Sequence, residues 1–127
     1  SGSRYLPQSA ELGIAAPGQR VEVNRWVTDE INRVTGWSLT DAFCGFKAYR
    51  LRALAGIELR EPGYGMPVEL WAKAYLAGLR VTERAVERIY CDHHRSFGDT
   101  LDDADVRFAY YMRVWKRALE GDEGVAW

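Results

Sequence analysis

A chain of 127 residues with 47% hydrophobic and 28% charged side chains is long enough for one globular domain with its own core. Its formal net charge of −1 argues against a nucleic-acid partner, because there is no general excess of basic residues. No apolar run is long enough to cross a bilayer, and two cysteines are too few for a disulfide scaffold.

The N-terminal part of the chain predicts the end of a strand, a loop and a long helix. Residues 1–6 resemble the tail of a strand, and residues 7–18 contain two prolines and two glycines, which predicts a loop. Residues 19–34 predict a helix, because apolar side chains recur there at helical spacing: Val23, Val27, Ile31 and Val34. Gly36 stands where a glycine commonly follows a helix.

The middle of the chain predicts a short strand over residues 46–50 and one helical turn over residues 51–55. Pro67 suits the first turn of a helix over residues 67–77, which Gly78 would end. The predicted inward face of this helix consists of Leu70, Ala74 and Ala77.

The C-terminal part predicts a strand over residues 80–90, a polar loop and a last helix over residues 103–119. The stripe of that helix is Phe108, Tyr111, Trp115 and Leu119, and the aspartates at its start suit a cap. The predicted fold is therefore α/β or α+β, with a small mixed sheet of about three strands flanked by three main helices.

Several short motifs follow one another in a specific order. Ser3-Arg4-Tyr5 comes first, a basic helix segment over residues 20–25 follows, and the turn over residues 41–50 reads Asp-Ala-Phe-Cys-Gly-Phe-Lys-Ala-Tyr-Arg. Further matches lie at residues 65–70, 78–81 and 95–98. This order resembles the acceptor-side half of family 2 glycosyltransferases, and the polyprenyl-phosphate mannosyl- and glucosyltransferases in particular.

The resemblance covers residues 1–119 and implies a partial GT-A-like fold, with residues 120–127 as a tail. It also implies that the N-terminal, nucleotide-binding half of the enzyme lies outside this chain. In the family, an Asp-x-Asp motif of that half holds Mn²⁺ or Mg²⁺ and the sugar diphosphate. Asp103 and Asp105 have the Asp-x-Asp spacing but lie at the wrong end of the chain. The fragment alone is therefore expected to bind no metal and to be inactive.

Asp41 is the best carboxylate for catalysis, because the resemblance aligns it with an aspartate near the acceptor and donor phosphates. A carboxylate base could take the proton of a hydroxyl acceptor. An aspartate before a turn can equally serve a local role, by accepting hydrogen bonds from the amides of its own turn. Both roles stay open at this level.

Three arginines are expected to contact the phosphate of the acceptor: Arg4, Arg20 and Arg25. A guanidinium binds phosphate oxygens in a bidentate way that lysine does not reproduce. Arg4 aligns directly with the family motif, whereas Arg20 and Arg25 align loosely. The alternative for the two helical arginines is a solvated helix face.

Cys44 stands where the family has a serine that donates a hydrogen bond near the acceptor phosphate. A thiol is a weaker donor than a hydroxyl, so Cys44 would offer the acceptor phosphate a weaker hydrogen bond than the family's serine does. Arg95 and Ser96 resemble the segment that closes over the donor diphosphate, without the family's lysine. His93 and His94 are adjacent and have no third ligand at a suitable spacing, so no metal site is predicted there.

The resulting prediction is a fragment of an inverting glycosyltransferase that moves a sugar from a nucleotide-sugar donor to an acceptor, with polyprenyl phosphate favoured. The alternative is a stand-alone module that binds an anionic or phosphorylated ligand without catalysis. An isolated fragment would expose a sheet edge, so we expect a homo-oligomer. We expect a cytoplasmic protein that meets a membrane peripherally or through sequence outside this chain.

Overall fold

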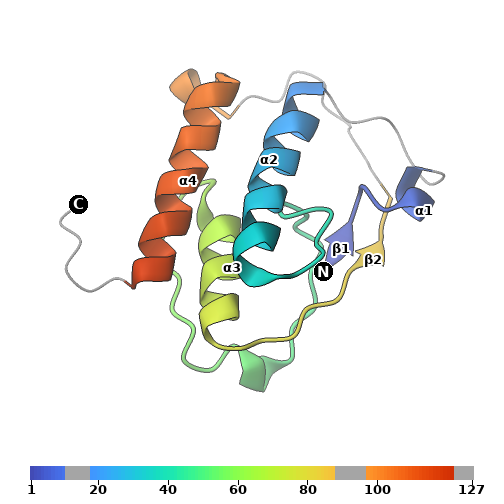
Figure 1. Cartoon of the computed structure of the whole chain (residues 1–127), viewed down its shortest axis with the longest axis vertical. Coiled ribbons are helices and arrows are strands. Elements are labelled where there is room, and N and C mark those ends of the chain that lie inside the picture. The colour runs from blue at the N-terminus through green and yellow to red at the C-terminus, as the bar shows by residue number, and fades with distance from the viewer. Residues whose placement is uncertain (11–17, 88–96, 122–127) are drawn as a thin grey trace.

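The computed structural model describes residues 1–10, 18–87 and 97–121, and its elements are drawn in Figure 1. Three helices form most of it: α2 at Gly18–Thr35, α3 at Met66–Leu76 and α4 at Ala104–Glu120. The short helix α1 spans Pro7–Ala10, and 3-10 turns lie at Leu51–Ala53 and Asp99–Asp102. The strands are β1 at Gly2–Ser3 and β2 at Arg84–Ala85.

The three long helices pack against one another, and the strands lie on the side of α2 away from α4 in the view of Figure 1. β1 and β2 are parallel, with Gly2 opposite Arg84 and Ser3 opposite Ala85. The fold is thus mixed α/β, as predicted at the coarse level. The prediction of a mixed sheet of about three strands is wrong for the described residues, which contain two parallel strands.

The predicted helices are confirmed to within a residue or two, and the apolar stripes explain why. Val23, Val27 and Ile31 of α2 are buried against Tyr111 and Trp115 of α4 in one core. Gly36 and Gly78 follow α2 and α3 with φ of +76° and +71°, the left-handed region that glycine adopts after a helix.

The predicted loop over residues 7–18 is wrong at Pro7–Ala10, which form α1, and two further details concern the longer helices. Ala77 was expected on the inward face of α3 but is exposed after the end of that helix. Asp103 caps α4 as predicted, because its Oδ1 accepts the amides of Asp105 and Val106 at 2.9 and 3.0 Å.

Two strand predictions are wrong in extent. Residues 46–50 form no strand, although the Phe46 carbonyl accepts the Gly2 amide at 2.8 Å. Of residues 80–87, only Arg84 and Ala85 form a strand, and residues 88–90 lie outside the described residues. Alternating sequences form strands only beside a partner, and β1 offers two residues for pairing.

Candidate functional site

The end of β1 meets the turn at Asp41, although the two segments are separated by 37 residues. Arg4 donates from Nε to Asp41 Oδ2 at 2.8 Å and from Nη2 to Oδ1 at 3.0 Å. The Arg4 backbone amide also donates to Oδ2 at 2.9 Å. This bidentate pair is the geometry in which an arginine is held most rigidly by a carboxylate.

Helix α2 supplies further donors to the same turn. Asn24 Nδ2 donates to Asp41 Oδ1 at 3.0 Å, and the Phe43 amide donates to the same oxygen at 3.2 Å. Thr28 holds the network in place, since its hydroxyl donates to Asn24 Oδ1 at 3.0 Å and accepts the Ala42 amide at 3.2 Å. The turn is therefore fixed against α2 by side chains one helical turn apart.

The other side of the turn is held by Glu83, just before β2. Its carboxylate accepts the Thr40 amide at 2.8 Å and the Asp41 amide at 3.0 Å. Trp71 of α3 adds a buried bond from Nε1 to the Ala42 carbonyl at 2.7 Å. Side chains from α2, from α3 and from the segment before β2 therefore hold the turn at residues 40–43 in place.

Asp41 is fully buried and remains ionised. Burial by itself would raise its pKa, but the hydrogen bonds and charge of Arg4, with a further bond from Asn24, outweigh this and lower the pKa. Both carboxylate oxygens already accept hydrogen bonds. In this arrangement Asp41 fixes the position of Arg4, and it also caps its own turn through the Phe43 amide.

Beside Arg4 lies a cavity of about 200 Å³. It is lined by a second arginine, Arg107 of α4, and by several aromatic side chains: Tyr5, Phe43, Tyr64, Phe97 and Tyr111. Arg107 is 3% exposed and donates from Nη1 to the Leu101 carbonyl at 2.9 Å. Its guanidinium carbon lies 4.5 Å from the centre of the Phe97 ring, and that of Arg4 lies 5.5 Å from the Tyr5 ring.

Tyr111 adds a proton donor to this cavity wall. Burial is the main cause that raises its pKa to about 12, so the phenol stays protonated at neutral pH. Its ring packs on Phe43 with centroids 4.7 Å apart. Two guanidinium groups and a phenol among aromatic rings can bind an anionic group joined to an apolar one, such as a phosphate on a hydrocarbon chain.

The other predicted site residues lie apart from this cavity or outside the described residues. Arg25 lines a neighbouring cavity of about 290 Å³, next to Tyr5 and Asn24. Cys44 is buried, with Sγ 3.2 Å from the place of a Cβ on Gly2, and does not line the Arg4 cavity. Arg20 belongs to α2, but its side chain is outside the description, as are Arg95 and Ser96.

Sequence reasoning missed Arg107, Tyr64 and Phe97 as lining residues. One signal was available for Arg107. It lies four residues before Tyr111, on the buried face of α4, where an arginine requires partners. Tyr64 and Phe97 come from loops, whose position no periodic pattern indicates; their rings meet edge to face at 5.2 Å.

Nowhere in residues 1–10, 18–87 and 97–121 do three or more His, Cys, Asp or Glu side chains gather as ligands for a metal ion. The described residues therefore provide no ligand cluster that fits a divalent metal ion. Within the same part of the chain, no helix combines the length and apolar character needed to cross a membrane.

Comparison of the chain with protein-family models, curated proteins and solved structures finds no match.

Proposed function

We propose that this chain is the acceptor-binding part of an inverting, family 2-like glycosyltransferase, and that the cavity beside Arg4 holds the phosphate of its acceptor. Polyprenyl phosphate is the favoured acceptor. One observation carries the proposal. Arg4 of the Ser-Arg-Tyr segment and Asp41 of the glycine turn are joined by a bidentate ion pair at the edge of an aromatic cavity. Both belong to the motifs on which the resemblance rests.

The chemistry suits a phosphate acceptor better than a hydroxyl acceptor. A phosphate monoester is already anionic at neutral pH, so its oxygen needs positioning rather than a base. Asp41, whose oxygens are occupied by donors, would then act as a positioning residue for Arg4 and not as the base. Arg4 and Arg107 would hold the phosphate, and the aromatic rings would contact the first apolar units of the acceptor.

In the full reaction, the held phosphate oxygen would attack the anomeric carbon of the donor sugar from the face opposite the nucleoside diphosphate. The carbon–oxygen bond to the diphosphate breaks as the new bond forms, which inverts the centre. A divalent metal, when bound by sequence outside this chain, would neutralise the leaving diphosphate. The contribution of the described residues is orientation and charge.

Sugar transfer is the direct test. The chain extended by the residues encoded upstream would be given nucleotide sugars, Mg²⁺ or Mn²⁺, and geranyl phosphate as a short acceptor. We expect transfer that falls at least about tenfold in Arg107→Lys, because lysine loses bidentate phosphate contact. Binding without transfer would instead favour the stand-alone anion-binding module, and neither binding nor transfer would contradict both.

Arg117 provides a matched control. Its Nη2 donates to Glu61 at 2.8 Å in a largely buried pair that does not line the cavity. Arg117→Lys should leave transfer within about twofold of the original rate, because Arg117 is also largely buried but lies away from the proposed acceptor site.

A further inference from the structure

Arg107 and Tyr111 are two almost completely buried polar side chains of α4, one helical turn apart on the same side of the helix. Each is only 3% exposed, and both line the cavity of about 200 Å³ beside Arg4. Buried polar groups of proteins nearly always have partners that satisfy them. A buried donor without a partner at the wall of a cavity therefore points to a ligand.

The guanidinium of Arg107 has unused donors and lacks a counter-charge. Its Nη1 donates to the carbonyls of Leu101 and Asp102 at 2.9 and 3.4 Å, which leaves Nε and Nη2. Within residues 1–10, 18–87 and 97–121, no carboxylate forms an ion pair with it. Burying an unpaired charge is costly, because the charge loses its water. An anion in the cavity would supply the missing charge.

The hydroxyl of Tyr111 is a second unused donor. In the part of the chain that the structure describes, it makes no hydrogen bond. Its ring packs on Phe43 with centroids 4.7 Å apart, so the side chain is held while its hydroxyl stays available. The neighbouring Tyr110 differs, because its hydroxyl donates to Glu61 and accepts the Gly65 amide at 3.2 Å.

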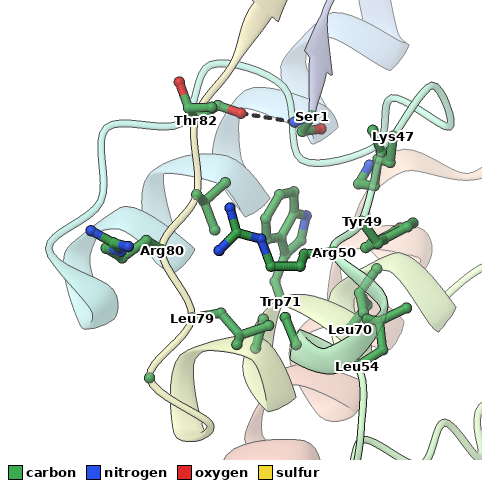
Figure 2. A pocket seen from close by; sticks show the side chains of 15 residues that line it. Ser1, Lys47, Tyr49, Arg50, Leu54, Leu70, Trp71, Leu79, Arg80 and Thr82 are labelled. Carbon is green, nitrogen blue, oxygen red and sulfur yellow. Dashed lines mark hydrogen bonds between the residues drawn. The ribbon is translucent and has the colours of Figure 1, made fainter.

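The arginines of a larger cavity do not share this property. That cavity, of about 440 Å³, lies between residues 47–50 and 79–82, with Arg50 and Arg80 among its lining residues (Figure 2). Both arginines are exposed, so water solvates their charge and no bound anion is required. Burial without a counter-charge distinguishes Arg107 from them.

Few charged or titratable groups surround the two donors. The other titratable residues that line their cavity are Arg4, Tyr5 and Tyr64. Among the described lining residues there is no carboxylate or histidine. Asp41 neutralises Arg4 through the bidentate pair. Arg107 is thus the cation whose charge is left for a ligand, with the Tyr111 hydroxyl as a neighbouring donor.

We propose that Tyr111 is a further phosphate-binding residue: its hydroxyl donates to an oxygen of the acceptor phosphate, which Arg107 holds through Nε or Nη2. The inference rests on the proposed function, because it takes the ligand of this cavity to be a phosphate monoester. The second pKa of such an ester is about 6, and donors that bind the dianion lower it. The acceptor would therefore be held as the dianion, which can attack without a base.

Tyr111→Phe tests this, because it removes the hydroxyl and keeps the ring. Phosphorus magnetic resonance of geranyl phosphate bound to the whole chain would report the second pKa of the bound ester. We expect this pKa to lie at least about 1 below that of the free ester, and Tyr111→Phe to raise it by about 0.5. The variant should also weaken binding about fivefold, yet leave the urea midpoint of the ligand-free protein unchanged, since the hydroxyl has no partner in the described protein.

Tyr110→Phe is the matched control, since that hydroxyl bonds the protein and does not line the cavity. It should lower the urea midpoint and leave the pKa of the bound phosphate unchanged. If Tyr111→Phe alters neither the affinity nor this pKa, the inference is overturned while the acceptor site stands. If geranyl phosphate does not bind the original chain, both are overturned. Binding that depends on Tyr111 in a protein without sugar transfer would support the inference and contradict the enzyme.

Discussion

Asp41 and Glu69 are both buried carboxylates with exposed fractions of 0% and 1%, yet only one lies beside a cavity with the features of a site. Glu69 accepts the amides of Arg60 and Glu61 at 3.0 and 2.8 Å, and Lys73 Nζ lies 2.8 Å away. Burial would raise its pKa, but these bonds lower it, as at Asp41. The environment of a carboxylate alone therefore does not identify a site.

The difference lies in what the paired cation faces. Lys73 also donates to the Glu58 carbonyl, so the cluster around Glu69 fastens the loop before α3 to that helix. Arg4 lines an aromatic cavity together with Arg107. The bonds of Glu69 thus serve the packing of a loop, while the similar network at Asp41 orients an arginine toward a space that a ligand can occupy.

The largest expected effect is on stability, and it is shared by the two regions. Asp41→Asn and Glu69→Gln each remove a buried charge from a cationic partner, so the free energy of unfolding should fall by about 3–5 kcal/mol in urea titrations. Of the two variants, only Asp41→Asn should also weaken geranyl phosphate binding once the folded fraction is taken into account. If Glu69→Gln weakened geranyl phosphate binding to the same extent, Asp41 would have no special role in positioning the ligand-binding arginine.

The next effect concerns affinity. Arg4→Lys keeps the charge but loses bidentate contact, so calorimetry should show geranyl phosphate binding weakened about tenfold. Arg117→Lys, in the pair with Glu61, should change the dissociation constant by less than about twofold. If both substitutions weaken binding to the same extent, Arg4 does not contact the ligand.

Low pH should reduce the stability that the ionised carboxylates of Asp41 and Glu69 each contribute to the fold. The folded state holds the pKa of Asp41 and of Glu69 below the ordinary values, so it binds fewer protons than the unfolded state. This stability is present above the unfolded pKa values and is lost as pH falls below about 4, through the lower folded values. Urea midpoints of the original chain should therefore approach those of Asp41→Asn as pH falls, and a constant difference would refute this.

The smallest effect is expected at Cys44. Cys44→Ser introduces the serine found in the family that this chain resembles, but the side chain is buried and does not line the Arg4 cavity. A buried hydroxyl should cost about 1 kcal/mol of stability, and the affinity for geranyl phosphate should not change. A clear gain in affinity would show that residue 44 does contact the acceptor.

The sequence predicted the parts of the molecule that depend on local patterns. The stripes of α2 and α4 gave correct helices because each stripe is buried in the same core. The prediction of a strand at residues 46–50 was wrong because a strand requires a neighbouring strand to pair with, and β1 is only two residues long. Arg4 and Asp41 came from motif order, whereas the position of Arg107 beside Arg4 depends on how α4 packs against the turn.

Nuclear magnetic resonance of the whole chain titrated with geranyl phosphate tests the central claim most directly, with geraniol and inorganic phosphate as controls. Saturable shifts should centre on the amides of Arg4, Phe43, Phe97 and Tyr111, and Arg4→Lys should weaken them. Geraniol and phosphate alone should bind far more weakly, because each has half of the recognised chemistry. No saturable shift at these amides, or equal shifts with geraniol, would contradict an acceptor phosphate site beside Arg4.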